Sequence, residues 1–254
     1  MSEPARKLLG KVPEVTFWFW VIKIAATTLG ETGGDAVTMS MNLGYAVGTA
    51  IFAAVFVGAV AAQASADRFR PYLYWFVIVA TTTAGTTLAD LLDRSLGIGY
   101  LGGSALLLAL LLATLALWYR SEGSVAVDTV SSPSVELFYW VTILFSQTLG
   151  TALGDFLADT SGLGYGGGAL VFGAALVGLA LLWRFTATDR VLLFWAAFIL
   201  TRPLGATVGD FLDKPRANGG LALDRFTASA VLVAFMVVCL LAFTQRAAKR
   251  AHGV

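Results

Sequence analysis

The sequence has little charge, one cysteine and one histidine. Charged residues make up 13% of its 254 residues, roughly half the share of an ordinary soluble domain. The single cysteine, Cys239, cannot form an intrachain disulfide, and His252 alone cannot supply a histidine-based metal site or a catalytic triad. The phosphate-binding pattern Gly-x4-Gly-Lys-[Ser/Thr] is also missing. These shortages argue against an enzyme, and the net charge of +1 argues against nucleic-acid binding.

Long apolar runs fill the chain instead. Hydrophobic residues make up 57% of it, and residues 46–66 and 95–119 contain no charge at all. Each of these runs exceeds the roughly 18–20 apolar residues that cross a bilayer. We therefore predict an all-α polytopic membrane protein, a single transmembrane domain over residues 1–254. Its eight transmembrane helices are expected at about 15–32, 43–63, 71–89, 98–119, 135–154, 163–183, 191–208 and 221–243.

Three residue types recur at fixed spacing in the pattern Trp-x9-Gly-x3-[Gly/Ala]-Asp, which occurs four times. The copies begin at Trp20, Trp75, Trp140 and Trp195. Self-similarity of this kind indicates a repeat architecture. We expect four parallel two-helix repeats, at about 15–66, 71–120, 135–185 and 190–245, in a pseudo-fourfold or pseudo-twofold bundle. The extra residues at about 121–134 are expected to link the two halves.

Basic residues are unevenly divided between the two sides that these spans define. Eleven lie in the terminal segments and in the loops after the second, fourth and sixth spans, against four in the opposite loops. Short segments rich in Lys and Arg stay on the cytoplasmic side. We therefore predict that both termini and the 121–134 linker are cytoplasmic, and that the repeat aspartates lie at the outer ends of their helices.

The repeated aspartate is the element that architecture explains least. A single Asp at the end of a span would cap the next helix or meet water. Four of them at the ends of parallel helices would converge, and close like charges need a cation or a proton between them. We expect a cation site here, with structural capping as the alternative. The candidate ligands are the core acids Asp35, Asp90, Asp155 and Asp210 and the auxiliary acids Glu31, Asp93, Asp159 and Asp213.

The same spans also contain small, basic and polar residues that are expected to support such a site. The pairs of small residues, such as Gly30 and Gly34, are expected to let helices pack closely or, alternatively, to permit a helix break. Charge inside a membrane is usually paired, so Arg202 is expected to be a counter-charge to carboxylates, while Lys23 lies nearer the inner side. Hydroxyl and amide groups would line a polar path or bond between helices; these are Thr28, Thr83, Gln147, Thr148 and Thr201.

Four sequence segments resemble a bacterial family described as uncharacterised membrane-anchored proteins, some of them labelled putative regulators of an amylopullulanase. The segments are TTLGETGGD, TTAGTTLAD, SQTLGTALGD and TRPLGATVGDFLDKP. The resemblance covers essentially the whole chain and implies a multi-pass protein of the bacterial plasma (inner) membrane.

A second resemblance, one of chemistry, is to exchangers that carry paired Glu-x-Gly-Asp-[Lys/Arg]-[Thr/Ser] motifs and move manganese or calcium. The segment from Glu31 to Asp35 is one residue longer than that motif, and Thr86, Thr151 and Ala206 replace the glutamate in the other copies. This resemblance implies a hard divalent cation held by oxygen ligands.

Together these features predict a secondary transporter or exporter of a small cation, with a divalent metal such as manganese first and calcium or magnesium next. The alternative is a non-catalytic membrane scaffold or regulator whose aspartates are structural caps. An enzyme acting on a lipid-linked substrate is a third interpretation, but no nucleophile–histidine pair supports it. The expected partners are the lipid bilayer and a small inorganic cation. No covalent cofactor is expected, and a homo-oligomer remains open.

Overall fold

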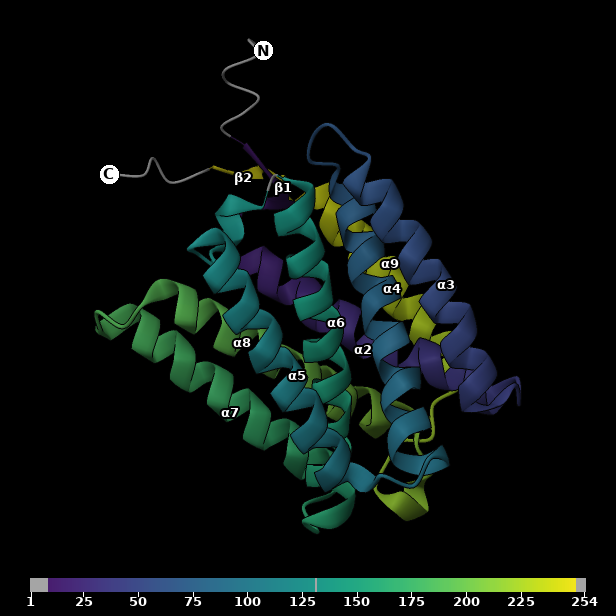
Figure 1. Ribbon diagram of the computed structural model, residues 1–254. Coiled ribbons are helices and arrows are strands. Elements are labelled where there is room, and N and C mark those ends of the chain that lie inside the picture. Colours follow the sequence, from purple (N-terminus) through teal and green to yellow (C-terminus); the bar gives the residue numbers. More distant parts are fainter. Residues whose placement is uncertain (1–8, 131, 250–254) are drawn as a thin grey trace.

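The computed structural model describes residues 9–130 and 132–249, and these form eight α-helices (Figure 1). Each predicted span coincides with one helix, to within five residues at every end. The helices are α2 (Phe17–Asp35), α3 (Gly44–Ala64), α4 (Pro71–Asp90), α5 (Gly99–Glu122), α6 (Pro133–Asp155), α7 (Gly164–Phe185), α8 (Arg190–Asp213) and α9 (Arg225–Ala242).

Among the described residues, seven helices are long and apolar enough to cross a membrane. The helix that is not among them is α2, whose 19 residues include Lys23, Glu31 and Asp35 and therefore have a lower mean hydropathy. By length and composition alone the count is thus seven, one fewer than the repeat pattern predicts.

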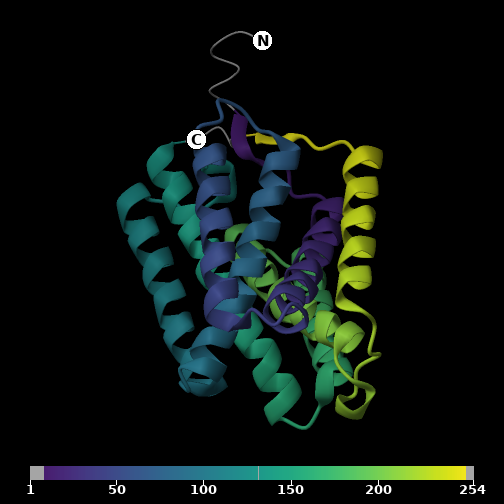
Figure 2. The same cartoon turned by 90° about the vertical axis from the view of Figure 1, so that its right-hand side faces the viewer.

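The helices form two concentric rings. In the inner ring α2, α4, α6 and α8 each pack against two neighbours, in that cyclic order. In the outer ring α3 packs on α4, α5 on α6, α7 on α8 and α9 on α2 (Figures 1 and 2). Every outer helix therefore packs on the inner helix of the next repeat, and the fourth repeat closes the ring on the first.

The repeat glycines lie where neighbouring inner helices touch. A Cβ atom on any of them would press against the residue that stands three positions before the glycine of the next repeat. The pairs are Gly30 with Thr82, Gly85 with Gln147, Gly150 with Arg202 and Gly205 with Thr27. All four glycines lie inside continuous α-helix, so they serve close packing and do not break the helices.

The outer ring exposes large apolar side chains. Leu101 on α5 is 71% exposed, Leu170 on α7 is 76% exposed and Leu241 on α9 is 71% exposed. Most side chains of the inner helices α4, α6 and α8 are instead buried. The bundle therefore has a buried centre and an apolar outer face.

One end of the bundle carries a feature that the all-α prediction did not contain. The strands β1 (Leu9–Pro13) and β2 (Ala247–Lys249) pair antiparallel, and the backbone N–H of Lys11 donates to the carbonyl of Val130, 3.0 Å away (Figure 1). The predicted linker is shorter than expected because α5 continues to Glu122 and α6 begins at Pro133. The two ends of the described chain thus meet on one side, as an even number of helices requires. We call this side the ribbon end and the opposite one the aspartate end.

Some residues used in the sequence predictions lie outside the described part of the chain. These are His252 and the terminal basic residues Arg6, Lys7 and Arg250.

Candidate metal centre

Residues spaced four apart form a stripe along one face of each inner helix. In α2 the stripe comprises Lys23, Thr27, Glu31 and Asp35, and each is at most 2% exposed. The equivalent positions of α4, α6 and α8 are also buried, so four layers of four side chains fill the centre of the ring. From the ribbon end to the aspartate end, the layers are Lys23, Ile78, Ile143 and Phe198; Thr27, Thr82, Gln147 and Arg202; Glu31, Thr86, Thr151 and Ala206; and Asp35, Asp90, Asp155 and Asp210.

Large side chains close the axis towards the ribbon end. The hydroxyl groups of Tyr74 and Tyr139 are 2.7 Å apart, one helical turn beyond Ile78 and Ile143. The repeat tryptophans belong to the same buried cluster: Trp75, Trp140 and Trp195 are buried and Trp20 packs against them. The indole N–H of Trp195 donates to the carbonyl of Val125 in the central linker, 2.9 Å away. The tryptophans are therefore packing residues that seal this end.

Arg202 joins all four repeats at the second and third layers. Its Nη2 donates to Glu31 Oε2 at 2.9 Å and lies 2.5 Å from both Thr86 Oγ1 and Thr151 Oγ1. Those three residues occupy the same position in repeats one, two and three, and Arg202 itself comes from repeat four. Arg202 is therefore an internal counter-charge, and the carboxylate that it contacts is Glu31 and not one of the repeat aspartates.

The four repeat aspartates converge as two pairs, each bridged by a basic side chain. Arg94 lies 2.9 Å from Asp90 Oδ1 and 3.1 Å from Asp155 Oδ2. Lys214 Nζ contacts Asp35 Oδ2 and lies 3.0 Å from Asp210 Oδ1. We call these the Arg94 half and the Lys214 half of the layer. The arrangement is pseudo-twofold, because repeats one and three each supply an aspartate and repeats two and four each supply an aspartate and a base.

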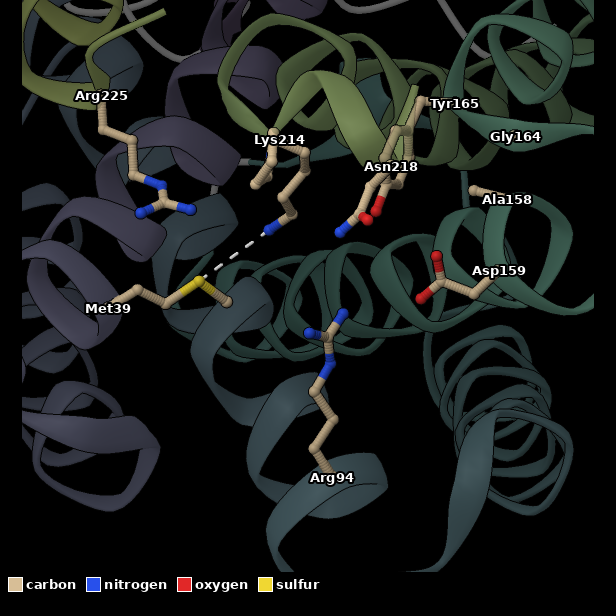
Figure 3. A pocket seen from close by; sticks show the side chains of 10 residues that line it. Met39, Arg94, Ala158, Asp159, Gly164, Tyr165, Lys214, Asn218 and Arg225 are labelled. Carbon is tan, nitrogen blue, oxygen red and sulfur yellow. Dashed lines mark hydrogen bonds between the residues drawn. The ribbon is translucent and has the colours of Figure 1, made fainter. Parts of the chain in front are cut away.

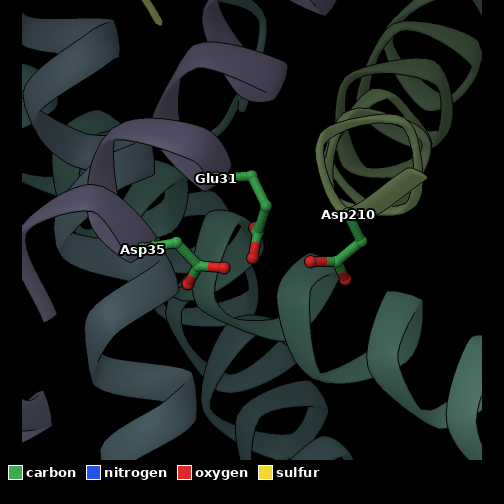
Figure 4. Close-up of side chains that lie close together, drawn as sticks. All are labelled: Glu31, Asp35 and Asp210. Carbon is green, nitrogen blue, oxygen red and sulfur yellow. The ribbon is translucent and has the colours of Figure 1, made fainter. Parts of the chain in front are cut away.

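A third carboxylate distinguishes the two halves. Glu31, Asp35 and Asp210 each place an oxygen within 4.8 Å of the other two, and all three residues are buried (Figure 4). Within the described residues, Asp35 Oδ1 has no hydrogen-bond partner although it is buried. In the Arg94 half, Thr151 stands at the position of Glu31. The Lys214 half is therefore the one that gathers oxygen ligands suited to a hard cation.

A pocket of about 480 Å³ opens at the aspartate end (Figure 3). Lys214, Arg94 and Arg225 reach into it from different helix ends, and Asp159 and Tyr165 line it as well. Lys214 also contacts Asp35 and Asp210, so this side chain adjoins both the pocket and the three-carboxylate cluster.

Besides Glu31, the three other auxiliary acids each have a different environment. Asp213 pairs with Arg225, whose Nε lies 3.0 Å from Asp213 Oδ2. Asp159 is exposed and accepts a hydrogen bond from the Tyr100 hydroxyl at 3.0 Å. Asp93 is buried beside Gly103, and neither of its carboxylate oxygens has a hydrogen-bond partner within residues 9–130 and 132–249.

Most of the predicted pathway residues bond to their own helices. Thr28, Thr83, Thr148 and Thr201 each donate to a carbonyl three or four residues earlier in the same helix. Gln147 does lie in the axial layers, but its amide atoms have no hydrogen-bond partner in the described part of the chain. Lys23 is also axial, and its Nζ lies 4.2 Å from the Phe198 ring centroid. The Thr27 and Thr82 hydroxyls donate across to the neighbouring inner helix, to the carbonyls of Thr201 and Ala26. Those of Thr86 and Thr151 contact Arg202 on the axis.

The predicted site did not include the basic residues Arg94, Lys214 and Arg225. The signal for two of them is in the sequence: Arg94 and Lys214 stand four residues after a repeat aspartate, a spacing that puts acid and base on one helical face. The sequence alone places both in loops, because it predicts that the spans end at the aspartates. Instead, five-residue π-helical turns continue from each aspartate in the first three repeats: η1 (Ala36–Ser40), η2 (Leu91–Ser95) and η4 (Phe156–Thr160).

In the fourth repeat α8 itself continues to Asp213 and stops before Pro215. The backbone of Lys214 there is extended, which is the conformation favoured before a proline.

Comparison with known families gives one match. No curated protein and no solved structure matches the chain. The model of a family described as a Repeat of Unknown Function (DUF347) matches four times, at residues 18–69, 73–124, 138–189 and 193–248. Each match covers one of the four two-helix units, and together they cover most of the sequence. The chain therefore belongs to the DUF347 repeat family.

Proposed function

We propose that this protein is a multi-pass membrane transporter for a small cation, with a divalent metal such as manganese as the preferred ion. The observation that carries the proposal is the cluster of Glu31, Asp35 and Asp210, whose buried oxygens lie within 4.8 Å of one another. Three carboxylates at this separation need positive charge or protons beside them in a buried setting. Arg202 and Lys214 supply two positive charges, and a metal ion is suited to the same oxygens.

The outer ring supports a location inside a bilayer. Leucine, valine and phenylalanine side chains cover the outward faces of α3, α5, α7 and α9. A soluble protein rarely exposes contiguous apolar patches of more than a few hundred Å². We place the ribbon end in the cytoplasm and the aspartate end outside, in the bacterial plasma membrane, because the basic residues cluster at the ribbon end.

The balance of charge around the axis supports a cation as the cargo. Nine acidic side chains lie at the aspartate end against five basic ones: Glu31, Asp35, Asp90, Asp93, Asp155, Asp159, Asp210, Asp213 and Asp224 against Arg94, Arg202, Lys214, Arg216 and Arg225. Oxygen-rich sites of this kind suit manganese, calcium and magnesium. A transport cycle then requires the aromatic seal around Tyr74 and Tyr139 to open, since it blocks the axis towards the ribbon end.

Uptake of Mn²⁺ into proteoliposomes that contain the purified full chain tests this proposal. We expect Asp210→Asn to abolish uptake, because it removes one of the three carboxylates. Asp224→Asn is a matched control: Asp224 is exposed, caps α9 through Thr227, and Asn caps a helix as well as Asp does. If Asp210→Asn protein that retains its fold transports as fast as the wild type, the proposal is wrong.

One observation favours a second candidate, a membrane scaffold or regulator. Each repeat aspartate already contacts a basic side chain, so this layer has a structural role whether or not a cation binds. A stoichiometric protein partner recovered from native membranes, together with absence of Mn²⁺ uptake by the wild type, would favour this candidate.

A further inference from the structure

We propose that Lys214 is a tethered counter-ion of the cation site: a cation binds at Glu31, Asp35 and Asp210 by displacing the Lys214 ammonium into the adjoining pocket. This inference rests on the proposed function and adds a mechanism of entry to it. Its basis is the position of Lys214, which contacts two of the three carboxylates and also lines the pocket.

The charge balance of the cluster explains why the Lys214 ammonium has to leave when a cation binds. Lys214 contacts Asp35 and Asp210, and Arg202 contacts Glu31, so two positive charges already face three negative ones. Arg225 lies 3.8 Å from Asp35 as well. A divalent cation added to this arrangement would leave an excess of buried positive charge, which is costly. Removal of one ammonium restores the balance. Arg202 is fully buried and hydrogen-bonded to three repeats, so Lys214 is the base that can leave.

Hydrogen bonds fix the backbone of Lys214, while its side chain can move into the adjoining pocket. Its N–H donates to the Asp210 carbonyl at 2.9 Å, and its own carbonyl accepts from Ala222 N–H at 3.0 Å. A lysine side chain turns about four bonds, so the ammonium can move without the backbone. Asp159 faces the same pocket and is exposed, which makes it the acid that can receive the displaced ammonium (Figure 3).

The Arg94 half provides a contrast within the same molecule. Arg94 bridges Asp90 and Asp155 through two different nitrogens, and Thr151 takes the place of a third acid. A guanidinium that is held at two points, beside only two carboxylates, has less reason to yield to a metal ion. Arg94 is therefore the matched control for Lys214.

Binding of Mn²⁺ to the purified full chain tests the proposal. We expect Lys214→Met to bind Mn²⁺ at least about tenfold more tightly than the wild type, because the competing ammonium is gone. Arg94→Met should change the affinity by less than about threefold. Tighter binding by both variants, or by neither, would overturn the role given to Lys214.

A second measurement uses the wild type alone, so it does not depend on the stability of a variant. Lysine acylation, mapped by mass spectrometry, should increase at Lys214 when Mn²⁺ is added, because the displaced amine enters the pocket. Lys11, which pairs with Glu136 at the ribbon end, should not change. Protection of Lys214 by Mn²⁺, or an unchanged rate despite binding, would show that the ion enters without displacing it.

These outcomes separate the two proposals. If the wild type binds Mn²⁺ and Asp210→Asn does not, the cation site stands whatever Lys214 does. If neither the wild type nor Lys214→Met binds Mn²⁺, both the cation site and the displacement are wrong.

Discussion

The Arg94 half and the Lys214 half of the aspartate layer show how one repeat produces two different sites. Both halves consist of two aspartates from neighbouring repeats and one base four residues after an aspartate. They differ at the residue after the repeat glycine, which is Glu31 in one half and Thr151 in the other. They also differ in the base, since a guanidinium bridges its aspartates in a fixed fork and an ammonium does so as a movable point charge. The common framework is therefore structural, and the differences mark the half that we propose as the cation site.

Removal of the base should produce the largest effect and should separate the halves through metal rescue. Lys214→Met and Arg94→Met each leave two buried carboxylates without their bridging charge, which should lower the free energy of unfolding by about 3 kcal/mol. Saturating Mn²⁺ should restore most of this loss in Lys214→Met and little in Arg94→Met. Thermal unfolding of the detergent-solubilised variants, with exposed Arg216→Met as the control, measures both effects. Equal rescue of the two variants would mean that the halves are equivalent.

Removal of the third carboxylate should have the next largest effect, a loss of Mn²⁺ affinity. Glu31→Gln keeps the shape of the side chain but removes its charge, and we expect Mn²⁺ affinity to fall about 100-fold, since ligand charge sets the affinity of such sites. Thr151→Val, the equivalent position in the Arg94 half, should change the affinity by less than about threefold. Isothermal titration of the two variants compares the halves directly, and a similar loss in both would remove the distinction.

Exchange of Glu31 and Thr151 should transfer part of the Mn²⁺ affinity from the Lys214 half to the Arg94 half. Because Arg202 Nη2 contacts both Glu31 and Thr151, a glutamate at either position can pair with it. Relative to Glu31→Thr alone, addition of Thr151→Glu should recover about tenfold in Mn²⁺ affinity. The same titration measures it, and recovery should be lost when Asp155→Asn is added. No recovery at all would show that the third acid is not what distinguishes the halves.

The smallest expected effect concerns the first axial layer, where Lys23 and Ile143 occupy equivalent positions. Lys23 Nζ is fully buried and has no hydrogen-bond partner in the described part of the chain, an arrangement that costs free energy. Lys23→Ile should therefore raise the free energy of unfolding by about 1 kcal/mol. The control Ile143→Val should lower it by about 1 kcal/mol. Destabilisation by Lys23→Ile would indicate that the amine has a partner, such as water or a proton path, that stabilises the fold.

The sequence predicts the positions of the helices well, because two independent features locate them. Apolar length locates each helix, and the regular spacing of Trp, Gly and Asp requires the four units to be alike. Close packing at the repeat glycines was predicted from the small residues, and each glycine does lie against a residue of the next repeat. The β1–β2 ribbon was not predictable, because its strands are far apart in sequence and too short to show an alternating pattern.

The candidate site was only partly predictable. The four aspartates do converge, but not as the symmetric ring that the repeat pattern suggests, because Arg94 and Lys214 divide them into pairs. The sequence predicts that the helices end at the aspartates. For this reason the site prediction did not include Arg94 and Lys214, which lie one helical turn further on. The special role of Glu31 was visible as a break in the repeat. Its partner Arg202 was visible in the same way, although their contact depends on how the ring closes.

The most direct test of the account is the position of a bound metal. Crystals of the full chain grown or soaked with Mn²⁺ should give one anomalous scattering peak among the oxygens of Glu31, Asp35 and Asp210, with Lys214 moved away from Asp35 towards Asp159. A peak between Asp90 and Asp155, or no peak at any of the repeat aspartates at Mn²⁺ concentrations that support uptake, would contradict it.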